Sequence, residues 1–150
     1  MIALASDHVG WPLKNVIIQY LNEKGLEYKD YGSYDPAQSV HYPEYGFLAA
    51  QAVAGHECEK GILFCGTGIG ISLAANKVRG IRCACCSEPY SAVMSRRHND
   101  ANMLALGARV VGGELAKMIV GAWLDGEFEG GKHALRVEMI GRIEDGTFTL

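Results

Sequence analysis

The segment best suited to chemistry is a short apolar run, Ile62 to Phe64, that ends in Cys65 and a glycine-rich turn, Gly66-Thr67-Gly68-Ile69-Gly70. A continuous apolar run of this kind is typical of a strand buried on both faces of a parallel sheet. Helical spacing begins at Ile71, so the turn is expected to join a strand to a helix and to present backbone N–H groups to an anion or a developing oxyanion. The same field would favour the thiolate form of Cys65, which could then accept a proton.

Two other interpretations of this segment stay open. Buried cysteines are common in strands, and glycine turns between strand and helix often serve packing alone. The turn is also close to a dinucleotide-binding fingerprint, with Glu88 about twenty residues on, where a ribose-binding acid would fall. That match is weak, because the turn lacks one spacer residue and does not follow the first strand of the chain.

The composition bounds the class of protein. The chain has 150 residues, 49% of them hydrophobic, which predicts one globular domain over residues 1–150. Its net charge of -3 argues against nucleic acid as a partner. Asp7 interrupts the apolar start of the chain, and no segment resembles a membrane span or a signal peptide. Five cysteines without framework spacing indicate a reducing, cytoplasmic setting.

Apolar strands alternate with amphipathic helical segments, which predicts a single-domain, Rossmann-like α/β fold: a three-layer sandwich with a five-stranded parallel sheet. The expected strands are Met1–Ala5, Glu27–Tyr31, Ile62–Cys65, Ile81–Cys85 and Met103–Leu106. The expected helices are Trp11–Lys24, Tyr45–Ala54, a segment from Ile71, a segment capped by Ser87 with Pro89 in its first turn, Glu114–Leu124 and Ala134–Ile143. The last helix follows the complete sheet, so its apolar face is expected to pack on a partner subunit.

Ligands of such sheets bind beyond the carboxyl ends of the strands. Asp7 and His8 follow the first expected strand, and Arg109 follows the fifth. Asp7 could instead cap the first helix, and Arg109, in an apolar stretch, needs either an anion ligand or a structural carboxylate. His98 leads into the fifth strand from the opposite end. Either His98 is unrelated to this site, or a second subunit supplies it.

Two further residue pairs could bind ligands. Lys132 and Arg136 are four residues apart and would share a helical face as an anion clamp, although most such pairs are merely solvated. Cys83 and Cys86 form a CxxC pattern on paper. Their apolar setting beside Cys85 favours core packing over metal binding or redox chemistry.

Together these motifs resemble the ribose-5-phosphate isomerase B family, within the wider group that includes galactose-6-phosphate isomerase. The resemblance spans nearly the whole chain. It is carried by Ser6-Asp7-His8-Val9-Gly10, Tyr42-Pro43, Cys65-Gly66-Thr67-Gly68-Ile69-Gly70-Ile71-Ser72, Ala74-Ala75-Asn76-Lys77, Cys86-Ser87-Glu88-Pro89-Tyr90, Ser95-Arg96-Arg97-His98-Asn99-Asp100, Gly107-Ala108-Arg109-Val110-Val111-Gly112 and Glu129-Gly130-Gly131-Lys132-His133.

The resemblance implies an aldose–ketose isomerase that interconverts ribose 5-phosphate and ribulose 5-phosphate through an enediolate, in the pentose phosphate pathway, without a metal or organic cofactor. Cys65 would be the base, Thr67 would lie near O1 or O2, and His98 would open the furanose ring. The remaining substrate contacts implied are the oxyanion-binding turn of Gly66, Gly68, Ile69 and Gly70, the sugar contacts Asp7, Tyr42 and Asn99, and the phosphate contacts His8, Arg109, Lys132 and Arg136. The family also implies a homodimer, or a tetramer, with shared active sites.

Three positions bear on the substrate. Some members of the family use a glutamate as the base at the position where this chain has Ile71. The resemblance therefore implies that this protein belongs to the members that use a cysteine base. Lys132 stands where relatives usually carry arginine, and lysine offers a point charge without a bidentate fork. His41 replaces a usual aspartate. An isomerase of a 6-phosphohexose (allose or galactose 6-phosphate) and a non-enzymatic nucleotide-binding module therefore stay as alternatives.

Overall fold

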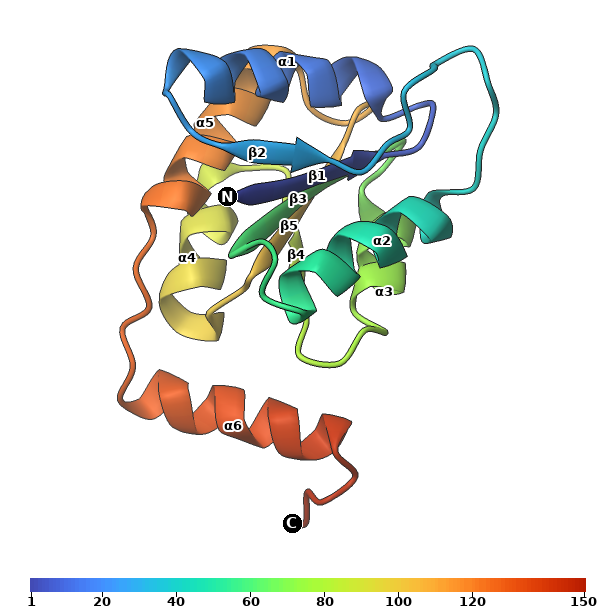
Figure 1. Ribbon diagram of the computed structural model, residues 1–150. Helices are drawn as coiled ribbons and strands as arrows, with labels where there is room; N and C mark the ends of the chain where they lie inside the picture. Colours follow the sequence, from blue (N-terminus) through green and yellow to red (C-terminus); the bar gives the residue numbers. More distant parts are fainter.

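The computed structural model describes residues 1–150 and contains one sheet of five parallel strands (Figure 1). The strands are β1 (Ile2–Ser6), β2 (Tyr28–Asp30), β3 (Lys60–Cys65), β4 (Cys83–Cys85) and β5 (Met103–Gly107). Their order across the sheet is β2-β1-β3-β5-β4. The chain adds β2 on one side of β1 and β3 on the other, so the order reverses between β1 and β3. The predicted five-stranded parallel sheet is confirmed.

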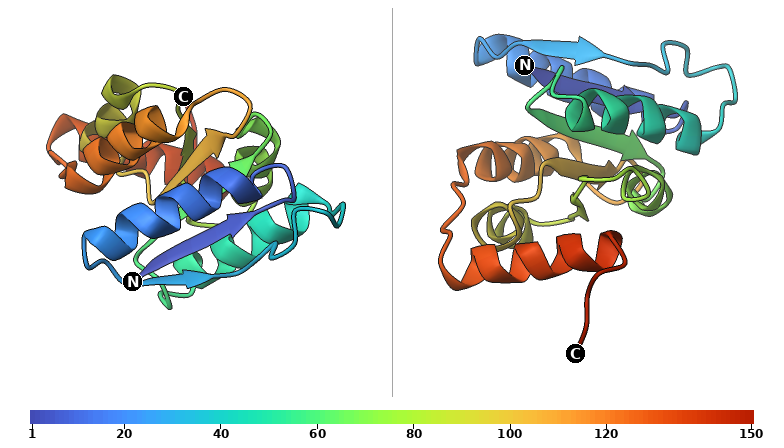
Figure 2. Two further views of the ribbon diagram at one scale, coloured as in Figure 1. Left: turned by 90° about the horizontal axis from the view of Figure 1, so that it is seen from above. Right: turned by 60° about the horizontal axis from the view of Figure 1, so that its bottom comes forward.

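Helices cover both faces of this sheet (Figure 2). They are α1 (Trp11–Glu23), α2 (Tyr42–Ala54), α3 (Ile69–Ala75), α4 (Pro89–Asn99), α5 (Gly113–Asp125) and α6 (Lys132–Glu144). One apolar cluster joins α1, α4 and α5 to one face, and a second joins α2 and α3 to the other. The three-layer arrangement predicted from the sequence is confirmed.

The strand that carries the cysteine, β3, is packed on both of its faces. Ile62 and Phe64 belong to the first apolar cluster and Leu63 to the second, and all three side chains are fully buried. Full burial of such a side chain contributes about 1.5–3 kcal/mol. Two packed faces therefore fix the direction and register of β3, and with them the position of Cys65 at its end.

Several predicted boundaries differ from the structure: β3, α3 and α6 each begin two residues earlier than expected, and three other differences have a local reason. α2 begins at Tyr42 rather than Tyr45, because Pro43 fits the first turn of a helix. Glu88, not Ser87, caps α4, and its carboxylate accepts a hydrogen bond from the Ser91 N–H at 2.9 Å. β4 is shorter than expected at its start, because the Arg82 N–H donates to the Asn102 side chain at 2.8 Å.

The last helix stands apart from the sheet, beyond the edge strand β4 (Figures 1 and 2). It contacts α4, but none of its residues is buried. Its apolar residues Leu135, Ile140 and Ile143 are exposed. No helix of the chain combines the length and the apolar character that crossing a bilayer requires.

Candidate active site

Cys65 ends β3 inside a tight turn. Its side chain is 4% exposed, and its Sγ accepts a hydrogen bond from the backbone N–H of Gly68 at 3.1 Å. Gly68 has a φ of +79°, and a Cβ there would lie 2.9 Å from the carbonyl carbon of Leu106. Only glycine therefore fits this position without strain. The hydrogen bond from the Gly68 N–H fixes the sulfur beside the glycine turn.

The turn offers free backbone donors beside this sulfur. The N–H groups of Gly66, Thr67 and Gly70 donate to no acceptor within the chain. They lie just before or within the first turn of α3, where the helix dipole is positive. Thr67 is held by its hydroxyl, which accepts a hydrogen bond from the Ile69 N–H at 3.2 Å. A thiol base next to free N–H donors is an arrangement that can form and hold an oxyanion.

Asp7 lies beside this turn, directly after the neighbouring strand β1. Ser6 pairs with Phe64, and the Asp7 N–H donates to the Phe64 carbonyl at 3.2 Å, so Asp7 faces the end of β3. Its buried carboxylate accepts the Gly10 N–H at 2.8 Å through Oδ1, and Oδ2 accepts no hydrogen bond within the chain. Asp7 thus closes the turn before α1 without capping that helix, whose own cap lacks a side-chain hydrogen bond. One carboxylate oxygen remains available to a ligand.

Two more residues predicted to bind substrate, His8 and Tyr42, lie at this edge, where the loop between β2 and α2 meets it. The Nδ1 of His8 accepts a hydrogen bond from the Val40 N–H at 3.2 Å. The Tyr42 ring packs over Gly70, where its Cζ would be 2.6 Å from an added Cβ. Both contacts tie the loop to the cysteine turn and to the end of β1.

A buried lysine that the sequence analysis did not identify anchors the same loop. Lys14 is fully buried in α1, and its Nζ donates to Asp30 Oδ1 at 2.8 Å and to the Ser33 carbonyl at 2.6 Å. Burial lowers the pKa of Lys14, and the partly exposed Asp30 opposes that shift. Lys14 therefore fixes the start of the loop that carries Val40 and leads into Tyr42.

Arg109 comes from the loop after β5 and lies beside Gly66. Its N–H donates to the Gly66 carbonyl at 3.0 Å, and its Nη1 would be 3.8 Å from a Cβ on Gly66. The side chain is exposed and forms no ion pair with a carboxylate of the chain, although Asp7 and Glu88 both lie near this edge of the sheet. The sequence analysis expected Arg109 to pair with either an anion ligand or a structural carboxylate, and no such carboxylate is found. The guanidinium is free to bind an anion.

The other predicted residues lie at the opposite end of the molecule. His98 and Asn99 end α4, and Lys132 and Arg136 lie in the first turns of α6. α4 starts next to the carboxyl edge of the sheet and has 11 residues. At 1.5 Å per residue it carries His98 roughly 15 Å away from that edge. One chain therefore does not bring His98 to Cys65.

His98 belongs to a side-chain cluster of its own. Its ring stacks on that of His133, with centroids 4.1 Å apart and an interplanar angle of 4°. Glu129 Oε2 lies 3.6 Å from Nε2 of His98 and 3.5 Å from Nε2 of His133. The lone pairs of two parallel rings do not converge on one point, so this arrangement would have to change before both imidazoles could bind one metal ion. In the sequence analysis Glu129 and His133 appear only as the two ends of the family motif Glu129-Gly130-Gly131-Lys132-His133, with no role of their own.

Cys83, Cys86 and Glu88 have structural positions. Cys86 belongs to the first apolar cluster and Cys83 packs against the second, so they lie against opposite faces of the sheet. Burial raises the pKa of Cys86 to about 11 and that of Cys83 further. Core packing of the CxxC pattern is confirmed. The dinucleotide interpretation loses its ribose-binding acid, because both carboxylate oxygens of Glu88 cap α4.

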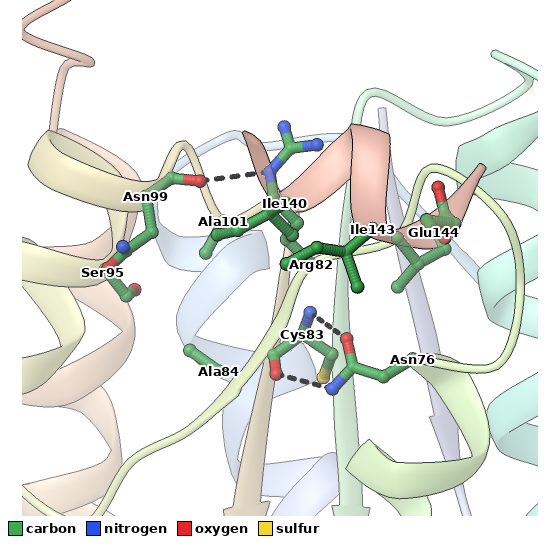
Figure 3. A pocket seen from close by; sticks show the side chains of 11 residues that line it. Asn76, Arg82, Cys83, Ala84, Ser95, Asn99, Ala101, Ile140, Ile143 and Glu144 are labelled. Carbon is green, nitrogen blue, oxygen red and sulfur yellow. Dashed lines mark hydrogen bonds between the residues drawn. The ribbon is translucent and has the colours of Figure 1, made fainter. Parts of the chain in front are cut away.

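A groove of about 510 Å³ separates α6 from the edge of the sheet (Figure 3). Its apolar lining includes Ile81, Ile140 and Ile143. At its floor the amide of Asn76 accepts from the Cys83 N–H at 2.7 Å and donates to the Cys83 carbonyl at 2.9 Å. The groove does not contain Cys65 or the glycine turn, so it is separate from the candidate active site.

A parallel sheet with a thiol, a free carboxylate oxygen and an unpaired guanidinium at its carboxyl edge defines an enzyme-like site for a small anion. The chain belongs to the ribose/galactose isomerase family, whose model matches residues 2–140. It is 57% identical over 143 residues to ribose-5-phosphate isomerase B of Escherichia coli strain K12, with 95% of both chains covered. It is 51% identical over 144 residues to the D-erythrulose-4-phosphate isomerase of Pectobacterium atrosepticum, covering 95% of this chain and 94% of the relative.

Solved structures that are similar to this chain belong to the same family. The ribose-5-phosphate isomerase B of Clostridium thermocellum matches with a TM-score of 0.95 and 53% identity, covering 98% of this chain and 99% of that one. The Mycoplasma genitalium enzyme, solved with bound ribulose-5-phosphate, matches with a TM-score of 0.91 and 38% identity, covering 96% of this chain and 95% of that one.

Proposed function

We propose that this protein interconverts ribose 5-phosphate and ribulose 5-phosphate without a cofactor, through an enediolate. The observation that carries the proposal is the Cys65 sulfur held at the end of β3 by the Gly68 N–H, beside the unused backbone donors of the turn. Relatives named ribose-5-phosphate isomerase B support the choice of substrate. The five free cysteines suit a reducing compartment, so we place the enzyme in the cytoplasm.

In this mechanism Cys65 removes the C2 proton of the open-chain aldose as a thiolate and returns it to C1, while the proton of the O2 hydroxyl passes to O1, so that the aldehyde becomes a hydroxyl and C2 becomes the ketone. The charge that develops on the sugar oxygen is stabilised by the N–H groups of Gly66, Thr67 and Gly70. The Thr67 hydroxyl and the free oxygen of Asp7 bind sugar hydroxyls near the reacting carbons. Donors that are already in place reorganise little as the charge forms, so their stabilisation is greatest in the transition state.

The phosphate is bound by basic groups drawn from two chains. His8 and Arg109 lie at the same edge of the sheet as Cys65, whereas Lys132 and Arg136 lie at the distant end with His98. A homodimer in which each site combines one edge with the partner's distant end accounts for both groups. The exposed apolar residues of α6 are available for such an interface.

The deciding experiment is an isomerase assay on dialysed protein with chelator present. Ribulose 5-phosphate should accumulate from ribose 5-phosphate until the same equilibrium is reached from either side. A protein that binds nucleotides but shows no turnover of either sugar would contradict the proposal. The matched negative control is the Cys65→Ser protein prepared in parallel.

A second substrate is favoured by one relative and one position of the chain. The Pectobacterium relative is named for a four-carbon sugar phosphate, and Lys132 offers no bidentate contact to a phosphate. A panel of ribose 5-phosphate, D-erythrose 4-phosphate and allose 6-phosphate, compared by kcat/KM, separates these candidates. The substrate would be reassigned if kcat/KM for either alternative were at least about tenfold higher than for ribose 5-phosphate. A tenfold difference corresponds to about 1.4 kcal/mol of transition-state stabilisation.

A further inference from the structure

The ring of His98 is held between two groups that no step of the proposed mechanism uses. His133 covers one face of the ring at a centroid distance of 4.1 Å. Glu129 lies at the ring edge, 3.6 Å from Nε2. Nδ1 of His98 makes no hydrogen bond within the chain and stays available. The His98 side chain is 40% exposed and that of His133 only 12%, so His133 is the more fixed of the two rings.

Glu129 is itself fixed to the helix that carries His98. Its Oε1 accepts a hydrogen bond from Nε of Arg97 at 2.6 Å, and its backbone N–H donates to the Arg97 carbonyl at 3.0 Å. These two contacts lock the linker between α5 and α6 onto the last turn of α4. Oε2 is thereby left facing the two imidazoles.

We propose that Glu129 and His133 are positioning residues that hold the His98 imidazole for opening of the furanose ring. This inference rests on the proposed function. The stacked ring limits rotation of His98, and the carboxylate stabilises the proton that His98 must deliver. Burial lowers the pKa of His133, with the charge of His98 acting in the same direction, so the neutral form of the covering ring is favoured.

The step served by this arrangement is a proton transfer at the ring oxygen. The hydroxyl on C1 loses its proton to water, C1=O forms, and the C1–O4 bond breaks with its electron pair going to O4. His98 gives its proton to O4 and is later reprotonated by solvent. The base Cys65 takes no part in this step, so ring opening and enediolate formation can be measured separately.

Ribulose 5-phosphate provides that separation, because its O5 carries the phosphate and closure through O4 would give a highly strained ring. It is therefore an open chain and requires no ring opening. Exchange of its C1 hydrogen for deuterium in D2O reports enediolate formation alone. The conversion of ribose 5-phosphate reports ring opening and enediolate formation together.

The test compares Glu129→Gln and His133→Ala with wild type by both measurements. We expect kcat for ribose 5-phosphate to fall about tenfold, part of the 10² to 10⁴ that a positioned proton donor contributes. Deuterium exchange into ribulose 5-phosphate should stay within about twofold of wild type, since Cys65 and its turn are unchanged. The control is Glu127→Gln, an exposed carboxylate on the same linker that forms no ion pair.

Equal losses in both measurements would show general damage to the site and overturn the proposal, as would unchanged turnover of ribose 5-phosphate in both variants. If His133→Ala does not fold, His133→Gln removes the ring while keeping a polar side chain, and the same pair of outcomes applies. A wild-type protein inactive on either sugar would instead refute the proposed function.

Discussion

The Tyr42 ring occupies the space in which Gly70 would carry a side chain, with Cζ 2.6 Å from that position. This contact joins the first residue of α2 to the turn that holds Cys65. It also explains why the turn needs glycine at a position with an ordinary backbone conformation. The pair therefore couples the shape of the glycine turn to the placement of a predicted sugar contact.

Gly70→Ala should displace Tyr42 and lower kcat/KM by about tenfold, mainly through KM, because a misplaced contact weakens substrate binding. Overpacking of this kind costs about 1–3 kcal/mol of stability, so a thermal melt should show a fall in Tm of several degrees. Gly112→Ala is the matched control, since nothing lies within 4 Å of its added Cβ. An unchanged KM would mean that Tyr42 does not contact the sugar.

Cys65→Ser should lower kcat at least about a hundredfold while leaving folding and phosphosugar binding nearly intact, because a positioned base contributes roughly 10² to 10⁴. Solvent exchange of the C2 proton of ribose 5-phosphate, followed by NMR, should fall in parallel. Cys58→Ser removes another buried thiol, one that contacts Tyr31 rather than the turn, and should keep wild-type kcat. Near-normal turnover by the Cys65 variant would remove this thiol from the base role.

Arg136→Ala should mainly raise KM, since a phosphate contact remote from the reacting carbons binds the ground and transition states alike. Lys132→Arg should leave kcat/KM for ribose 5-phosphate unchanged or improve it, because the guanidinium adds a bidentate contact. Initial rates over a range of substrate concentrations decide both. A large loss with Lys132→Arg would show that this lysine recognises a different sugar phosphate.

Mixing two inactive proteins should restore activity if the site is shared between subunits. Cys65→Ser and His98→Asn homodimers should each be impaired, whereas a heterodimer combines one doubly altered site with one intact site. Statistical exchange makes half of the dimers hetero, so about a quarter of wild-type activity should return. If mass spectrometry shows exchange and no activity returns, both residues act within one chain.

The parts of this fold that sequence reasoning identifies are those governed by local pattern. The run Ile62 to Phe64 carries its own burial signal, and the glycines after Cys65 mark the turn by composition alone. Residue type favours Ser87 as the cap of α4, because hydroxyl side chains are common at that position, but in the folded chain the carboxylate of Glu88 accepts the hydrogen bond from the Ser91 N–H.

The contacts missed by sequence reasoning depend on tertiary structure. Glu129 meets His98 and Arg97 only because the linker after α5 returns along α4. Lys14 is buried without any apolar signal, since its partners, Asp30 at the end of β2 and Ser33 in the loop that follows, are brought to it by the packing of α1. Residue type alone does not reveal such pairings, because each partner would be unremarkable on an exposed surface.

The paired hydrogen bonds between the Asn76 amide and Cys83 have a consequence for solubility. An edge strand normally offers its N–H and C=O groups to any extended peptide, and many proteins protect such edges with charge or proline. Here a side-chain amide from the end of α3 takes the place of an incoming strand and occupies both groups of Cys83. At Cys83 the sheet edge therefore offers no free backbone group to an incoming strand, so the part of β4 open to pairing with another chain is shorter than the strand itself.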